Sequence, residues 1–173
     1  DNVPSNEFMN LEGDKMSTSR GWSIEMDDYI NDFVKKENGG GQMVDALRYY
    51  LTQIAPETKD SEFTWKGFQE AYNNELVNNL SNFVHRVLVL THKYYDGFVT
   101  DFDPDSIFTG VAPDDMGGFH DTECLYLFDK LDELNQCHRD FDFRAAMKCL
   151  MEISTQGNQL LQLNEPWKNQ KED

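Results

Sequence analysis

The chain has 173 residues, a formal net charge of −17 and 13% aromatic residues. Its length and aromatic content oppose intrinsic disorder and allow one domain with a hydrophobic core, with room for an appendage. No apolar run reaches the ~20 residues of a membrane span and no signal peptide is recognisable, so we expect a soluble protein. The acidic balance opposes nonspecific binding to nucleic acid, whose phosphates attract clustered Lys and Arg.

The first predicted element is a short strand within residues 6–11. Partial alternation of polar and apolar residues indicates the strand, and the triplet Glu12-Gly13-Asp14 indicates a turn after it. A polar and basic segment, residues 15–21, follows. Ser23 is a candidate cap for the next helix, which ends at the glycines 39–41. The apolar face of this helix consists of Tyr29, Ile30, Phe33 and Val34.

Two more helices are predicted before residue 96. Asp45 is a candidate cap for a helix from Ala46 to Ile54, which ends before Pro56. Thr64 is a candidate cap for a long helix that reaches about Tyr95, and we expect this helix to soften at Asn73-Asn74. Its apolar stripe consists of Leu76, Leu80, Phe83, Val87 and Leu90.

The last predicted elements are a long surface connection and two amphipathic helices. Residues 96–118 are rich in Gly, Pro and Asp, as is typical of a loop. The first of the two helices carries Cys124, Leu127, Phe128, Leu131 and Leu134, and the second carries Ala146, Cys149, Leu150, Ile153, Leu160 and Leu161. The predicted fold class is therefore all-α, an antiparallel helical bundle preceded by a short strand, a loop and connecting helices.

The segment from Lys15 to Gly21 is the first candidate site. It offers one ammonium, one guanidinium, hydroxyl groups and backbone amides within seven residues, which are the groups that bind a triphosphate. The spacing of a P-loop is absent. A basic surface turn before a helix is the alternative, and composition alone favours it.

Three ordered segments carry a resemblance to a known family. Lys15-Met16-Ser17-Thr18-Ser19 resembles the Lys-Met-Ser-Lys-Ser (KMSKS) signature of class I aminoacyl-tRNA synthetases. Two flanking segments resemble methionyl-tRNA synthetases in particular: Asn6-Glu7-Phe8-Met9-Asn10 and Asp45-Ala46-Leu47-Arg48-Tyr49-Tyr50-Leu51. The resemblance extends from about residue 3 over the rest of the chain and weakens across residues 98–118.

The resemblance implies two parts of such an enzyme. Residues 1–60 would be the KMSKS-type loop and connecting segment of the catalytic part, and residues 61–173 would be the helical anticodon-binding domain. Asn164-Glu165-Pro166-Trp167 looks like a helix start with Pro at the first position, and we therefore expect a C-terminal fragment that is truncated at its own C-terminus.

The resemblance also implies a role for the loop in ATP chemistry. ATP, with Mg²⁺, would bind there while methionine is adenylated, and the loop would stabilise the departing pyrophosphate. The implied catalytic residues are Lys15, Ser17, Thr18 and Ser19, and the implied phosphate contacts are Lys15, Thr18 and Arg20. Thr18 replaces the second Lys of the signature, so either Lys15 and Arg20 supply the charge or hydroxyl and backbone donors compensate.

The family's His-x-Gly-His element and methionine pocket are not found in the chain. Its four histidines, His85, His92, His120 and His138, do not have the required spacing. We therefore expect no adenylation activity and no tightly bound cofactor for this chain alone. We also expect the loop at residue 15 to be mobile without its catalytic domain.

A row of amide and guanidinium side chains is the second candidate site. Asn78, Asn82 and Arg86 are spaced four residues apart on one helix, with Asn79 alongside. Such a row can read base edges and phosphate together; the alternatives are a solvated face or interhelical hydrogen bonds. The resemblance implies that this row reads the anticodon of tRNA(Met) and that Trp167 stacks on an anticodon base. The alternative for Trp167 is a core aromatic residue.

No metal site is predicted. Asp101, Asp103 and Asp105 imitate the start of an EF-hand loop, but Ser106 occupies the glycine position and Ala112 the position of the bidentate Glu. Cys137-His138 has no companions at zinc spacing. The three cysteines are expected to be buried, reduced thiols, which indicates the cytoplasm.

A second function class stays open, that of a non-catalytic acidic helical module that binds a protein partner. The charge of −17 favours it, and the ordered motifs oppose it. If the chain does bind tRNA, a local basic and amide patch around Arg86 must provide recognition, and much of the acidic surface must face away.

Overall fold

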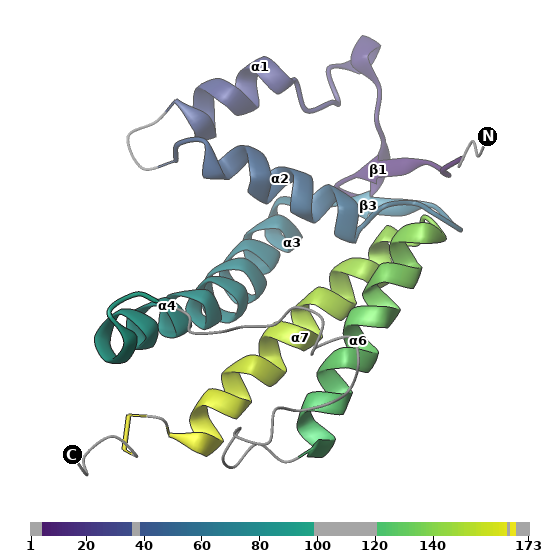
Figure 1. Ribbon diagram of the computed structural model, residues 1–173. Helices are drawn as coiled ribbons and strands as arrows, with labels where there is room; N and C mark the ends of the chain where they lie inside the picture. Colours follow the sequence, from purple (N-terminus) through teal and green to yellow (C-terminus); the bar gives the residue numbers. More distant parts are fainter. Residues whose placement is uncertain (1–4, 36–38, 99–120, 166, 169–173) are drawn as a thin grey trace.

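The computed structural model describes residues 5–35, 39–98, 121–165 and 167–168, with only the backbone described for residues 121–125 and Asn164. These residues are mostly helical, and a three-stranded sheet lies at one end of the helices (Figure 1). The predicted helices are present, but the all-α class is corrected by the sheet. Within this part of the chain no helix combines the length and apolar character needed to cross a membrane.

The sheet joins two segments that are far apart in the sequence. Strand β1 (Met9–Leu11) pairs antiparallel with β2 (Asp14–Lys15) and parallel with β3 (Ser61–Phe63). Glu12 and Gly13 both have positive φ, 49° and 83°, as in a type I′ hairpin turn, which Gly tolerates at its second position. The predicted strand is confirmed. Strand β3 was missed because its three residues show no alternation of their own that extends beyond the strand, and it forms through its pairing with β1, about fifty residues earlier.

Two α-helices lie between β2 and β3 in the chain, and both begin at positions other than those predicted. Helix α1 (Met26–Tyr29) continues into the π-helical turn η2 (Ile30–Val34), and α2 spans Gln42–Gln53. Ser23 does not cap α1, because its hydroxyl group donates instead to the Glu25 carboxylate at 2.7 Å. Asp45 lies in the first turn of α2 rather than at its cap, because the helix begins at Gln42 with Gly41 at the N-cap. The Tyr29 hydroxyl group donates to the carbonyl oxygen of Met43 in this first turn at 2.7 Å.

The predicted long helix is confirmed, and its hydrogen-bonding pattern changes from α-helical to π-helical and back along its length. It comprises α3 (Trp65–Glu70), the π-helix η3 (Ala71–Ser81) and α4 (Asn82–Tyr95). Thr64 is the cap, because its Oγ1 accepts a hydrogen bond from the backbone N–H of Gly67 at 3.0 Å. The π-helical stretch includes Asn73 and Asn74, where softening was predicted; such stretches occur often at functional sites.

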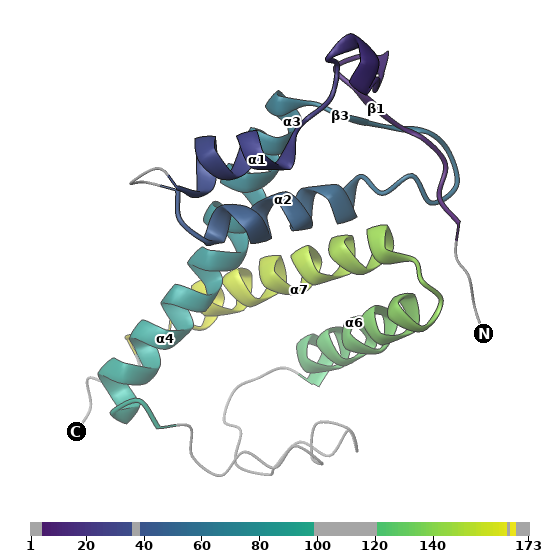
Figure 2. The same ribbon diagram turned by 90° about the horizontal axis from the view of Figure 1, so that it is seen from above.

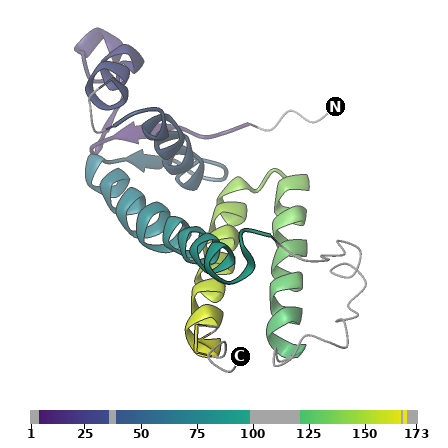
Figure 3. The same ribbon diagram turned by 60° about the vertical axis from the view of Figure 1, so that its left-hand side comes forward.

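Helices α6 (Asp121–Arg139) and α7 (Phe143–Asn164) form an antiparallel hairpin. Helix α7 is central, since it packs against α2, η3, α4 and α6. Figure 2 shows α1, α2, α7 and α6 in successive layers, and Figure 3 shows α4 crossing α7. Most of the predicted connection at residues 96–118, including the EF-hand-like aspartates, lies outside the described residues.

The buried core lies where the sheet meets α1, α2 and α3. It consists of Leu11, Tyr29, Ala46, Leu47, Tyr50, Phe63, Phe68 and Ala71. Trp65 stacks on Phe33 at 5.5 Å between ring centroids, and Phe63 meets Tyr50 edge-on at 5.3 Å. The core takes residues from both sides of the predicted boundary at residue 60, so that boundary stays a prediction.

Candidate functional site

The Lys15 loop, defined as residues 15–20, is held at its base by backbone hydrogen bonds. Ser17 and Trp22 exchange two of them, at 2.8 and 2.9 Å, and the Trp22 indole N–H donates to the carbonyl oxygen of Leu11 at 2.9 Å. Between them Thr18–Arg20 form a 3₁₀ turn that ends at Gly21 with φ 66°. The loop therefore projects from the β1–β2 hairpin as a closed turn.

The charged groups of the Lys15 loop are in different environments. Lys15 is exposed, with Nζ 4.9 Å from the centroid of the Phe8 ring. Arg20 pairs with Asp14 at 3.2 Å and donates to the backbone carbonyl oxygen of Lys15 at 3.0 Å. Ser17 and Ser19 lie with their hydroxyl oxygens 3.2 Å apart, and Thr18 is exposed. Lys15 is thus the cation of the loop that has no carboxylate partner among the described residues.

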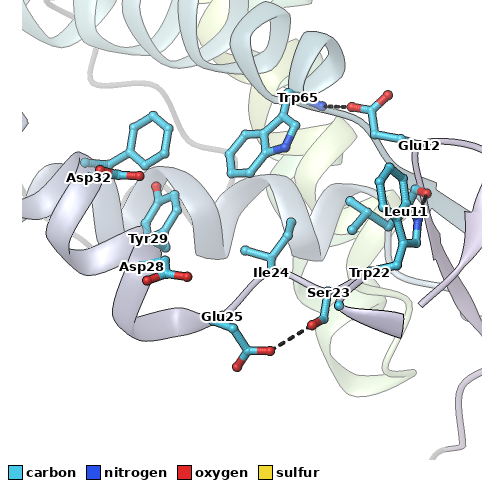
Figure 4. A pocket seen from close by; sticks show the side chains of 12 residues that line it. Leu11, Glu12, Trp22, Ser23, Ile24, Glu25, Asp28, Tyr29, Asp32 and Trp65 are labelled. Carbon is cyan, nitrogen blue, oxygen red and sulfur yellow. Dashed lines mark hydrogen bonds between the residues drawn. The ribbon is translucent and has the colours of Figure 1, made fainter. Parts of the chain in front are cut away.

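A cavity of about 330 Å³ lies beside the loop, between α1 and the sheet (Figure 4). Its walls are aromatic, from Trp22, Tyr29 and Trp65, and acidic, from Glu25 and Asp28. Carboxylates repel a triphosphate, so the cavity does not suit ATP. No residue from 15 to 20 lines it. The predicted phosphate contacts are therefore on the exposed turn and not in a preformed pocket.

The second candidate site lies where α4 crosses α7. Arg86 Nη1 donates to Asn158 Oδ1 at 3.1 Å, and Arg86 Nη2 lies 3.5 Å from Gln162 Oε1. Asn82 Nδ2 lies 3.5 Å from the same Asn158 oxygen. Asn78 is exposed and makes no side-chain hydrogen bond to any described residue. The predicted row thus contacts α7 at Asn82 and Arg86 and is open to solvent at Asn78.

Asn79 belongs to the helix interface rather than to the exposed row. Its side chain donates to Thr155 Oγ1 at 3.0 Å and to the carbonyl oxygen of Met151 at 3.1 Å, and it accepts from Ser154 Oγ at 2.9 Å. Ser154 is only 1% exposed. For Asn79 the structure therefore matches the interhelical alternative.

Trp167 lies next to the predicted row although it is 81 positions from Arg86 in the sequence. The Arg86 guanidinium carbon is 5.9 Å from the centroid of the Trp167 ring, within the range of a cation–π contact. Trp167 is half-buried and lies outside the main hydrophobic cluster. Asn82, Arg86 and Trp167 are thus brought together on one side of the helical unit.

Two residues of this site were missed from the sequence, Asn158 and Gln162. They are spaced four residues apart on α7, so a polar stripe was present as a signal. The sequence does not reveal which helix such a stripe faces. The crossing of α4 and α7 is close because Gly157 has no side chain: a Cβ there would lie 2.4 Å from the Phe83 ring.

The remaining candidate ligands do not gather into a metal site within the described residues. Cys149 is buried and Cys137 half-buried, both as free thiols. Burial raises the pKa of both thiols, so the protonated form is favoured. The side chain of Cys124 is outside the described set.

The chain is similar to known proteins along its whole length. It is 48% identical to a methionine–tRNA ligase of Phocaeicola vulgatus, 45% identical to one of Porphyromonas gingivalis and 40% identical to one of Flavobacterium johnsoniae, each over all of this chain. The chain covers 23%, 23% and 22% of those proteins, respectively, and therefore spans about a quarter of their length.

A solved structure has the same fold. It is the Mycobacterium tuberculosis methionyl-tRNA synthetase in complex with methionyl-adenylate, which matches with a TM-score of 0.66 and 21% sequence identity over 98% of this chain and 29% of that one. The model of the family described as tRNA synthetases class I (M) matches residues 1–88, more than half of the chain, and includes the Lys15 loop. The chain belongs to the class I (M) tRNA synthetases.

Proposed function

We propose that this chain is the part of a methionine–tRNA ligase that combines an ATP-phosphate loop with an anticodon-binding helical unit, at the C-terminal side of the enzyme. The observation that carries the proposal is the meeting of Asn82, Arg86 and Trp167 at one surface, where the last two are 5.9 Å apart. Amide, guanidinium and indole groups together can bond to base edges, contact phosphate and stack on a base.

The Lys15 loop would serve the adenylation step of the full enzyme. ATP, accompanied by Mg²⁺, would be held there by the exposed Lys15 ammonium group, with Ser17, Thr18 and Ser19 as hydroxyl donors. An exposed charge without a carboxylate partner is free to contact the pyrophosphate as its charge develops. Arg20 would first have to exchange Asp14 for phosphate, and such a surface ion pair contributes only ~0–1 kcal/mol.

The anticodon proposal is tested by titrating RNA stem-loops into the chain at low salt, where screening is weak and the charged contacts are strongest. One RNA carries the methionine anticodon and another carries altered anticodon bases. We expect the first to bind more tightly, and Trp167→Ala to weaken it by roughly 5- to 150-fold, as expected for ~1–3 kcal/mol of lost stacking. Tyr126→Ala, which removes a partly exposed aromatic residue on α6, is the matched control.

Equal binding of the two RNAs by the unaltered chain would contradict the proposal. The protein-interaction alternative predicts that result, because such a module would ignore the anticodon. The comparisons do not favour this alternative, since the relatives that match over the whole chain are named methionine–tRNA ligases. The cytoplasm is the compartment that we propose, in keeping with the free thiols of Cys137 and Cys149.

A further inference from the structure

Asn158 of α7 lies where Asn82 and Arg86 meet that helix. Its Oδ1 accepts a hydrogen bond from Arg86 Nη1 at 3.1 Å and a longer one from Asn82 Nδ2 at 3.5 Å. Its backbone carbonyl oxygen is also 3.5 Å from Arg86 Nη1. One residue of α7 therefore contacts both side chains of α4 that we propose to read the anticodon.

The nitrogen of the Asn158 amide is anchored inside the helix interface. Nδ2 donates to the backbone oxygens of Asn79 and Ser154, both at 3.2 Å, and lies 3.3 Å from Asn79 Oδ1. All three partners are acceptors. Turning the amide over would set its oxygen against them, so Oδ1 is held toward Arg86.

The partners of Asn158 are themselves fixed. Asn79 is held by Ser154, Thr155 and Met151 of α7, and Ser154 is fully buried. Buried polar groups are costly to leave unpaired, which makes such a network rigid. The network therefore connects a buried part of the interface to the exposed row on α4.

We infer that Asn158 is a positioning residue for anticodon recognition, which holds the Arg86 guanidinium, and more weakly the Asn82 amide, in the orientation that reads bases. The inference rests on the proposed function. Arg86 contacts α7 through Nη1 and through one N–H of Nη2, and we infer that its Nε and the other N–H of Nη2 are the donors that contact RNA. A guanidinium that is already ordered loses less side-chain entropy on binding.

The test is a double-mutant cycle on RNA binding by the chain. We expect Asn158→Ala to weaken binding of the methionine anticodon stem-loop by about tenfold, the size of one charge-assisted hydrogen bond. In an Arg86→Ala background the same change should have little further effect, because there is no guanidinium left to position. Gln159→Ala removes an exposed amide one residue further along α7 and is the matched control.

Equal losses from Asn158→Ala in both backgrounds would overturn the inference, because they would indicate a direct RNA contact or a purely structural effect. If Asn158→Ala lowers the melting temperature so far that the chain unfolds, Asn158→Ser keeps a small polar group at the helix interface and still removes the amide oxygen that contacts Arg86. We again expect about tenfold weaker binding; unchanged affinity would overturn the inference. Failure of the unaltered chain to discriminate anticodons would instead contradict the proposed function.

Discussion

Thr18 stands where the Lys-Met-Ser-Lys-Ser signature has its second lysine. The structure indicates how the remaining positive charges of the loop are placed when that lysine is absent. Arg20 is the other cation of the loop, but Asp14 and the backbone oxygen of Lys15 already engage it. The geometry therefore favours Lys15, with hydroxyl and backbone N–H groups, as the phosphate contacts of the loop. Arg20 is less suited to this role because its guanidinium is already engaged. The role of each residue stays a proposal.

Replacement of Lys15 is the residue-scale prediction. In the full-length enzyme, Lys15→Ala should lower kcat for methionine activation by about tenfold to a hundredfold, the range of ~1.5–3 kcal/mol for a hydrogen bond from a charged group. The KM for methionine should change little, because the loop acts on the phosphates. ATP–pyrophosphate exchange measures both. Lys35→Ala, an exposed lysine of the same part of the chain, is the control; an equal loss from that variant would contradict a specific role.

Two adjacent asparagines show where residue-level prediction from the sequence ends. The spacing of Asn78, Asn82 and Arg86 correctly placed them along one helix, with Asn79 beside the row. In the structure Asn79 is the interface residue and Asn78 is solvent-exposed. The difference depends on where α7 packs and on the π-helical winding of η3, and neither can be obtained from spacings of three and four residues.

At the scale of elements, features that depend on residues within one helix were predictable from the sequence. Features that depend on contacts between distant segments were not. The Thr64 cap and the long helix to Tyr95 depend on local chemistry, and both were correct. Strand β3 forms through its pairing with β1, and the first turn of α2 is tied to α1 by the hydrogen bond from the Tyr29 hydroxyl to the Met43 carbonyl oxygen. Both features depend on partners more than ten residues away in the sequence.

A second long-range contact caps helix α7. The Glu57 carboxylate, from the segment after α2, accepts from the backbone N–H groups of Phe143 at 2.7 Å and Arg144 at 3.1 Å. A carboxylate at a helix N-terminus satisfies free donors and interacts favourably with the helix dipole. This contact therefore ties the connecting segment to the helical unit.

Removal of this cap is the first element-scale prediction. Glu57→Ala should lower the free energy of unfolding by ~0.5–2 kcal/mol, as expected for loss of a capping side chain. Urea denaturation measures the change. Asp132→Ala removes the same charge from an exposed position on α6 and should be nearly neutral. If the two variants are equally stable, the capping contact does not stabilise the fold.

An ion-pair cluster between α6 and α7 leads to a pH prediction. Lys130 bonds to Glu152 and Glu133, each at 2.7 Å. The hydrogen bond from Lys130 lowers the pKa of Glu152 below its ordinary value. A lowered carboxyl pKa in the folded state stabilises the protein above the ordinary value of about 4.3, and this stabilisation is lost as the pH falls through the folded-state pKa.

Glu152→Gln should therefore lower the free energy of unfolding near neutral pH. It should also make that free energy fall less steeply as the pH is lowered into the acid range. The difference from the unaltered chain should shrink as the pH falls below the ordinary carboxyl value of about 4.3 and through the lowered pKa of Glu152 in the folded state. Thermal unfolding from pH 3 to 7 measures it, with Asp132→Asn as the control. A constant difference at every pH would show that Glu152 acts through packing and not through its charge.

On the scale of the whole molecule, α7 connects the two proposed activities. It contacts α2 of the connecting segment and both η3 and α4 of the long helix, and its C-terminal turn carries Gln162 of the candidate RNA surface. The core beside the Lys15 loop and the polar network beside Arg86 are thus parts of one packed arrangement. A fold of this kind can keep a loop for ATP and a surface for RNA in a fixed relation.

The net charge of −17 makes salt dependence the whole-molecule prediction. If recognition depends on Arg86 with amides and Trp167 rather than on a broad basic face, few phosphates are neutralised. Each phosphate contact with single-stranded RNA contributes a slope of about −0.7 to log K against log salt, so we expect a total slope of about −0.7 to −1.

Arg86→Ala should bring that slope close to zero, and it can become positive because salt also screens the repulsion between the acidic protein and RNA. Lys66→Ala, an exposed lysine at the other end of the long helix, should leave the slope unchanged. Titrations of the methionine anticodon stem-loop at several salt concentrations measure these values. A slope steeper than about −4 would require about six phosphate contacts, which would contradict recognition by one cation and its amide neighbours.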